Sequence, residues 1–149
     1  MKRYKKLFYH AMFLLYIGFL MWILFNRSRY VENMPYWDQV RRYLNLQPLR
    51  TIRLYLRLLM HPVRQVHTGL AFYNLVGNLL LFLPMGAMLP LIFPRLRSFP
   101  KTFFTVLLLV LGVEITQVLL LAGSCDIDDV ILNMAGCILG YPFHRLLNL

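Results

Sequence analysis

The residues best suited to chemistry lie close together near the C-terminal end of this 149-residue sequence. The chain has six acidic residues, and four of them fall between positions 112 and 136. One of these, Glu114, is the single charged residue in the stretch 102–122, which is otherwise uncharged and mostly apolar. An ionisable side chain in such a stretch is costly, so Glu114 is a candidate functional residue by default.

Other polar residues can meet Glu114 if the segments around them are helical. Gln117 is three positions further on and shares its helix face, while Asp129 and Asn133 lie four apart on a later segment. Counting residues from the turns places these side chains, and Asn78 on an earlier segment, at similar depths. We expect one polar layer contributed by three helices, because buried polar groups must satisfy one another.

Two more acidic residues, Asp126 and Asp128, complete the set of candidate substrate-binding residues, and each has a structural alternative. Asp126 can cap the helix that follows it, with Asp129 three positions later in a pair that resembles a capping box. Asp128 lies off the polar stripe and suits the positive end of the helix dipole. Asn and Gln side chains also often do no more than hold membrane helices together. Glu114 is least well explained in this way, because a glutamine would make the same hydrogen bond.

Two kinds of chemistry fit these groups. Carboxylate oxygens are ligands that Mg²⁺ and Ca²⁺ prefer, and such a cation at the acidic hairpin could organise a lipid pyrophosphate. A protonated Glu114 beside an ionised Asp129 would instead form an acid/base pair. The sequence has no Ser/His/Asp set, no glycine-rich phosphate loop and no zinc motif. We therefore assign no catalytic residue, no metal ligand and no cofactor, and we favour binding over catalysis.

The composition indicates which elements must position these residues. Hydrophobic residues make up 59% of the chain, and the mean hydropathy is +0.58. These values are typical of a membrane protein, and about 20 apolar residues suffice for one span. We predict an all-α, polytopic membrane protein that forms a single domain over 1–149. Its four transmembrane helices are expected at about 7–25, 70–93, 102–122 and 127–145.

The long connection between the first two spans has a helical pattern at 49–60. Arg50, Arg53 and Arg57 share one face, and apolar residues share another. The segment is too short and too charged to span a bilayer, so we expect an amphipathic helix in the interface whose arginines reach lipid head groups. The net charge of +10 also favours anionic membrane lipids as partners. Nucleic acid is not expected, because no basic soluble domain is present.

Four glycines are placed for close packing between helices. Gly136 and Gly140 form a G-x-x-x-G pattern on the fourth span, and Gly77 and Gly86 lie on the second. In that second span, Pro84 and Gly86 should kink the helix, and Pro90 and Pro94 should end it.

The positive-inside rule is tied when all Lys and Arg are counted on each side. The charges nearest the span ends favour a multi-pass protein of the cell membrane with both termini cytoplasmic. This orientation places the acidic hairpin outside.

The spacing of these polar residues resembles that of a known family. Residues 74–86 (NLVGNLLLFLPMG) are similar to the first motif of the VanZ-like membrane proteins of bacteria. Glu114-x-x-Gln117, followed by 126–141 (D-x-D-D-x-x-x-N-x-x-G-x-x-x-G-Y), looks like their second motif. Residues 45–52 (NLQPLRTI) are similar to the family's N-L-x-P-F-x-T-I stretch. The resemblance covers about residues 12–141.

The resemblance implies a cell-envelope protein, since the founding member of the family is associated with low-level resistance to the glycopeptide teicoplanin. On this basis we expect the polar layer to form an intramembrane pocket that engages a lipid-linked cell-wall component or a lipophilic glycopeptide. Two alternatives stay open. One is a membrane-embedded enzyme that acts on a lipid head group, and the other is a non-catalytic protein of helix packing or assembly.

Overall fold

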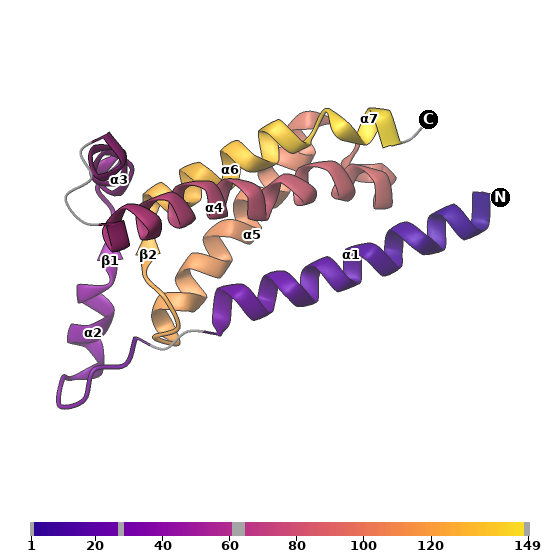
Figure 1. Ribbon diagram of the computed structural model, residues 1–149. Helices are drawn as coiled ribbons and strands as arrows, with labels where there is room; N and C mark the ends of the chain where they lie inside the picture. Colours follow the sequence, from indigo (N-terminus) through magenta and orange to yellow (C-terminus); the bar gives the residue numbers. More distant parts are fainter. Residues whose placement is uncertain (1, 27–28, 61–64, 148–149) are drawn as a thin grey trace.

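Long helices dominate the structure, a computed structural model that describes residues 2–26, 29–60 and 65–147. The helices α4 and α6 run side by side, α5 crosses them, and α1 lies along a separate flank (Figure 1). The elements in order are α1 (Lys2–Phe25), α2 (Tyr36–Arg42), β1 (Leu44–Asn45), α3 (Arg50–Met60), α4 (Gln65–Ile92), the 3₁₀-helix η1 (Pro94–Leu96), α5 (Phe99–Leu119), β2 (Cys125–Asp126), α6 (Ile127–Gly140) and α7 (Phe143–Leu147).

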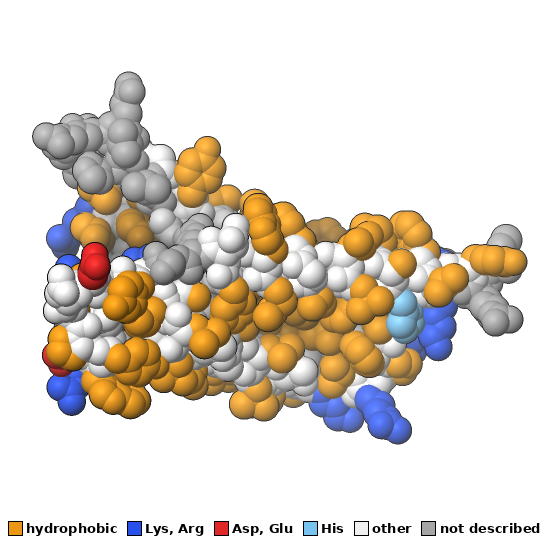
Figure 2. Space-filling view, turned by 90° about the horizontal axis from the view of Figure 1, so that it is seen from below, with side chains coloured by type: hydrophobic (Ala, Val, Ile, Leu, Met, Phe, Trp, Pro, Cys, Tyr) orange, Lys and Arg blue, Asp and Glu red, His pale blue; other side chains and the backbone are white. Residues whose placement is uncertain are grey.

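The prediction of an all-α protein with four spans is confirmed. Four segments are long and apolar enough to cross a membrane: Tyr4–Phe25, Ala71–Ile92, Phe99–Leu119 and Ile127–Leu147. Apolar side chains cover the surface along these helices, and Lys and Arg gather at the two ends of the molecule (Figure 2). This distribution is the one expected for a bundle whose sides face lipid tails and whose ends face head groups.

The end of α5 and the effect of one proline in α4 differ from the prediction. The helix α5 ends at Leu119 rather than at 122, and Leu121 then adopts a left-handed backbone conformation with φ of 51°. The helix α4 ends at Ile92, two residues before Pro94, as predicted, but it continues through Pro90, so the prediction that Pro90 takes part in ending it is wrong. Proline is tolerated inside membrane helices where neighbouring groups satisfy the freed backbone.

Glycines bring α4 and α6 into backbone contact. A Cβ on Gly136 would lie 2.0 Å from the Leu79 carbonyl oxygen, and one on Gly140 would lie 1.9 Å from that of Leu83. From the other side, a Cβ on Gly86 would lie 2.1 Å from the Cys137 carbonyl oxygen. These three positions therefore exclude any larger side chain unless the helices separate.

Gly77 differs from the expectation that it packs against another helix. A Cβ there would meet nothing within 4 Å.

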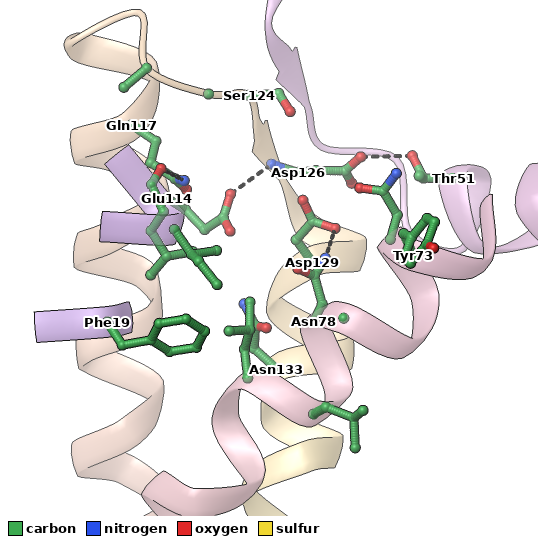
Figure 3. Close-up of a pocket in the computed structure, with 18 of the residues that line it drawn as sticks. Phe19, Thr51, Tyr73, Asn78, Glu114, Gln117, Ser124, Asp126, Asp129 and Asn133 are labelled. Atoms are coloured by element: carbon green, nitrogen blue, oxygen red, sulfur yellow. Dashed lines mark hydrogen bonds between the residues drawn. The ribbon is translucent and has the colours of Figure 1, made fainter. Parts of the chain in front are cut away.

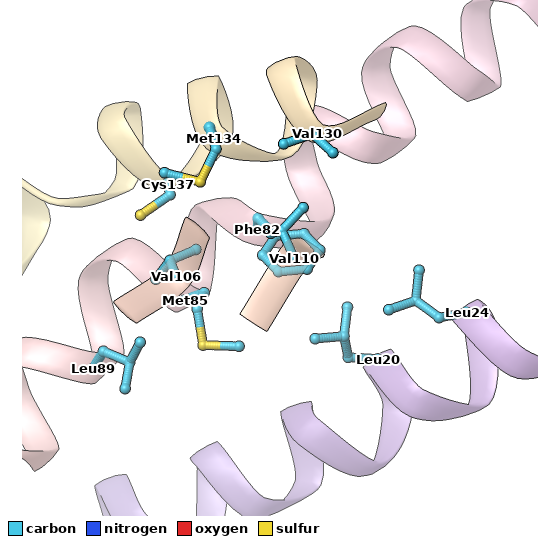
Figure 4. Close-up of a cluster of buried hydrophobic side chains, with 10 residues drawn as sticks. All are labelled: Leu20, Leu24, Phe82, Met85, Leu89, Val106, Val110, Val130, Met134 and Cys137. Carbon is cyan, nitrogen blue, oxygen red and sulfur yellow. The ribbon is translucent and has the colours of Figure 1, made fainter. Parts of the chain in front are cut away.

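An apolar core joins the four long helices (Figure 4). It contains large side chains from each of them, all of which are buried. Its members are Leu20, Leu24, Phe82, Met85, Leu89, Val106, Val110, Val130, Met134 and Cys137. This core contains no residue of the predicted polar layer, so the two are separate parts of the bundle interior.

The connection between α1 and α4 folds over one end of the bundle. The helix α3 crosses this end, close to the starts of α4 and α6 (Figure 1), and it coincides with the predicted amphipathic helix at 49–60. The strands β1 and β2 pair in parallel, with Leu44 opposite Cys125 and Asn45 opposite Asp126. This strand pair was not predicted. It fixes the connection directly to the start of α6.

The glycine contacts give a first prediction. We expect Gly136→Ala to destabilise the protein by about 1–3 kcal/mol, because the added methyl group overpacks a backbone contact. Gly112→Ala is the matched control, since a Cβ at Gly112 would meet nothing within 4 Å. Thermal unfolding of both variants in detergent measures the difference. Equal melting temperatures for the two variants would contradict the close contact between α4 and α6.

Candidate functional site

A cavity of about 550 Å³ lies at the end of the bundle covered by α3. The helices α1, α3, α4, α5 and α6 all contribute to its lining, together with the connection from α5 to α6. All five residues of the predicted polar layer line it, and Asp126 lines it as well. Figure 3 shows these side chains directed toward a common space from α4, α5 and α6. The polar residues labelled there are Thr51, Asn78, Glu114, Gln117, Ser124, Asp126, Asp129 and Asn133.

Glu114 and Gln117 tie α5 to its neighbours. Glu114 is only 3% exposed, and its Oε2 accepts the backbone N–H of Asp126 at 3.1 Å. Gln117 donates from Nε2 to the carbonyl of Leu24 at 2.7 Å, at the end of α1. Both residues were predicted from depth counting, which correctly placed them on one face. Each also has a structural partner, so position alone does not assign a function.

The polar side chains of α4 and α6 differ in how well they are satisfied. Asn78 donates from Nδ2 to a carboxylate oxygen of Asp129 across the helix pair. Asn133 is 2% exposed, and its Oδ1 is the one buried side-chain oxygen or nitrogen among the described residues that has no hydrogen-bond partner. A buried acceptor without a partner costs about 1–3 kcal/mol. Asn133 is therefore the member of the layer that the protein itself does not satisfy.

Asp126 has a structural role at the edge of the cavity. Its Oδ1 accepts the N–H of Asp128 at 2.9 Å, so it caps α6 as the alternative interpretation allowed. Its Oδ2 accepts the Thr51 hydroxyl at 2.7 Å and the Asn45 amide at 3.0 Å. Both carboxylate oxygens are thus engaged by the protein.

Asp128 is a predicted binding residue that the structure places away from the cavity. Its side chain is fully buried, at 0% exposure, against the segment that leads into α3. One carboxylate oxygen accepts the N–H of Leu49, and the other accepts those of Thr51 at 2.7 Å and Ile52 at 3.0 Å. Leu49 has a left-handed φ of 63°, which is unusual for a leucine. Asp128 is therefore an anchor for the start of α3.

Sequence reasoning did not find this anchor. The partners of Asp128 are backbone groups more than 75 positions away. Every residue except proline has a backbone N–H, so a sequence pattern cannot show which ones bind a distant carboxylate. The available signal was the 45–52 stretch, whose Asn45 and Thr51 side chains bind Asp126. The 45–52 stretch and the acidic start of α6 are thus parts of one contact.

Three further residues surround the polar groups. Arg29 lines the cavity, is exposed, and lies over the Tyr43 ring with 5.6 Å between the guanidinium carbon and the ring centroid. Burial raises the pKa of Tyr55, and the carboxyl groups of Asp129 and Asp126 raise it further. Burial raises the pKa of Cys125 as well, so this thiol is a poor nucleophile at neutral pH.

The remaining predicted sites lie outside the cavity or at its wall. Arg50, Arg53 and Arg57 are exposed on α3, away from the cavity lining. Gly77 lines the cavity wall. No three His, Cys, Asp or Glu side chains in the part of the chain that the structure describes are grouped to hold a metal ion.

The wall of the cavity between α1 and α4 is apolar and aromatic. Tyr16, Phe19 and Leu24 contribute from α1, and Leu80 and Leu81 from α4. Phe19 is 53% exposed and Leu80 is 54% exposed. Cavity-lining side chains that are also exposed on the apolar flank of the bundle indicate an opening toward the lipid tails.

Comparisons with known proteins identify relatives of the chain. A family model described as VanZ/LLP1 matches residues 13–148. The chain is similar to Protein VanZ of Enterococcus faecium, with 29% identity over 143 residues that cover 96% of this chain and 77% of the relative. No solved structure matches the chain. The family match includes every residue that lines the cavity.

The Asp128 contacts give a second prediction. Asp128→Ala should lower the stability by about 3–5 kcal/mol, because it leaves buried N–H groups without an acceptor. Amide hydrogen exchange should rise at Leu49, Thr51 and Ile52. Asp38→Ala is the matched control, since the Asp38 side chain is 56% exposed in a pair with Arg41. Unchanged exchange at the start of α3 would show that Asp128 does not hold it.

Proposed function

The chain belongs to the VanZ/LLP1 family, and on that premise we propose that it is a cell-envelope membrane protein whose cavity engages the head group of a membrane-resident molecule. A lipid-linked cell-wall component is one such molecule, and a lipophilic glycopeptide is another. Engagement of either would let the protein contribute to teicoplanin resistance. The observation that carries the proposal is the polar cavity at one end of an apolar bundle, with an apolar side wall.

The position of the cavity suits such a ligand. Its polar groups lie beside the α5–α6 connection and α3, at the end of the bundle where a bilayer gives way to head groups. Its apolar wall between α1 and α4 faces the side of the bundle, where lipid tails lie. An amphiphile could therefore place its head in the polar part and its chain along the wall without leaving the membrane. In any bilayer the head-group region is polar and the tail region is apolar.

The electrostatics support binding over a purely structural role for the layer. Glu114 and Asp129 share one cavity, and nearby carboxyl groups repel one another when both are ionised. Helix packing alone would be served by neutral amides at lower cost. A ligand with hydrogen-bond donors would reduce the repulsion between these two carboxyl groups.

We also propose that both termini are cytoplasmic, which puts the cavity at the outer leaflet. The beginning of α1 and the end of α7 lie at the same end of the bundle, opposite α3 (Figure 1). The outer leaflet is the place where a cell-wall precursor and an external glycopeptide are both accessible.

A resistance assay tests the proposed function. Cells that express Glu114→Gln or Asp129→Asn at wild-type membrane levels should be as susceptible to teicoplanin as cells without the protein. Asp38→Asn is the matched control, because it removes an exposed carboxylate outside the cavity, and it should keep wild-type resistance. If both cavity variants keep full resistance, the cavity has no part in this function.

A labelling experiment tests the orientation. In a Cys125→Ser background, where Cys137 is buried, Ser124→Cys should react with a membrane-impermeant maleimide on intact cells. Ser98→Cys, at the exposed start of α5 on the opposite end, should react only after the cells are permeabilised. The reverse pattern would place the cavity at the inner leaflet.

A further inference from the structure

We propose that the head group this cavity recognises is a primary ammonium carried by a lipid, with its N–H donors directed at acceptors around Asn133. This inference rests on the proposed function, because it specifies the ligand class of the same cavity. It goes beyond that function by excluding head groups that lack a primary ammonium.

The unpaired Asn133 oxygen is the first observation behind this inference. Asn133 Oδ1 is buried, lines the cavity and has no partner within the described residues. Its cost is relieved only by a donor that enters the cavity. A ligand whose head group has acceptors alone would leave this oxygen unsatisfied.

Three polar side chains of the cavity lining direct a donor at acceptors of the protein. Asn78 donates to Asp129, Gln117 donates to the Leu24 carbonyl, and Thr51 donates to Asp126. These donors are thus engaged within the protein. The Asn133 oxygen and the carboxyl groups of the lining are acceptors that suit a ligand that supplies donors.

The charges favour a cation at the same place. Three carboxyl groups line the cavity, on Glu114, Asp126 and Asp129, against one guanidinium, on Arg29, among the described lining residues. An anion would be repelled by those of the three carboxyl groups that are ionised, and this repulsion is strong where water is scarce. An ammonium would be attracted and could donate hydrogen bonds to the ionised carboxylates.

Arg29 could bind the phosphate that lies next to the ammonium in such a head group. It is exposed at the cavity lining and held over the Tyr43 ring, and its backbone N–H donates to the Leu121 carbonyl at 2.7 Å. A phosphate placed next to the ammonium could bind this guanidinium outside the acidic region. The apolar wall formed with Phe19 and Leu80 would then take the acyl chains.

Lipid retention measured by native mass spectrometry tests this inference. The purified full-length chain is exchanged into detergent with equal amounts of dioleoyl phosphatidylethanolamine, phosphatidylcholine and phosphatidylglycerol. The first two share a phosphate and differ in the N–H donors of the ammonium. We expect phosphatidylethanolamine to be retained about tenfold over phosphatidylcholine, the ratio that one such hydrogen bond gives. Equal retention of these two lipids, or preference for phosphatidylglycerol, would overturn the proposal.

Asn133→Leu separates recognition from structure. The variant should lose the preference for phosphatidylethanolamine, yet its melting temperature without added lipid should not fall, because it removes an acceptor that has no partner in the protein. Asn26→Leu is the matched control, since Asn26 is exposed and does not line the cavity. If Asn133→Leu still prefers phosphatidylethanolamine, Asn133 Oδ1 does not recognise the ammonium.

A cavity-filling variant distinguishes this inference from the proposed function. Gly77→Leu adds a side chain at a cavity-lining position where a Cβ meets nothing within 4 Å, and it should reduce the retention of whichever lipid binds. If Gly77→Leu lowers retention without any preference among head groups, the cavity binds lipid and the ammonium inference fails alone. If it changes the retention of no lipid, the proposed function fails as well.

Discussion

The structure depends on the carboxylates at the start of α6. Asp126 and Asp128 accept hydrogen bonds from the side chains of Asn45 and Thr51 and from backbone N–H groups at the start of α3. Hydrogen bonds to a carboxylate are stronger than those between neutral groups, and here they replace water that a buried N–H would otherwise need. They attach the connection between α1 and α4 to the start of α6, and the bonds of Tyr36 to Leu119 and of Arg29 to Leu121 attach it to the end of α5. The parallel pair of β1 and β2 adds a short backbone ladder at the start of α6.

This attachment determines what is left for binding. The carboxylates of Asp126 and Asp128 are occupied by hydrogen bonds within the protein. Glu114, Asp129 and Asn133 are therefore the central polar groups of the cavity. Further along the same face of α6, the glycine contacts with α4 leave no space, so the polar part and the close-packed part of this face follow one another along the helix. The helix α1 bounds the cavity with Tyr16 and Phe19, and the Tyr16 hydroxyl also donates to the Leu81 carbonyl of α4.

Much of the fold follows from local sequence properties. Long uncharged runs predict the four spans, and an arginine face opposite an apolar face predicts α3, because both patterns depend on neighbours a few positions apart. Depth counting also predicted that Asn78, Glu114 and Asn133 meet. The contacts of Asp128 were not predictable in this way, since its partners are remote backbone groups on a residue, Leu49, with an unusual φ. Gly77 shows the same limit, because its spacing fits helix packing but its environment is the cavity.

The central claim is that the cavity is a head-group site and not merely a polar layer that packs helices. A structure determined in a bilayer that contains phosphatidylethanolamine tests it most directly. The account predicts head-group density within hydrogen-bond distance of Asn133 Oδ1, with acyl-chain density along the wall formed by Phe19 and Leu80. A cavity closed by movement of α1 against α4, with Asn133 Oδ1 bonded to a protein donor and no lipid density inside, would contradict it.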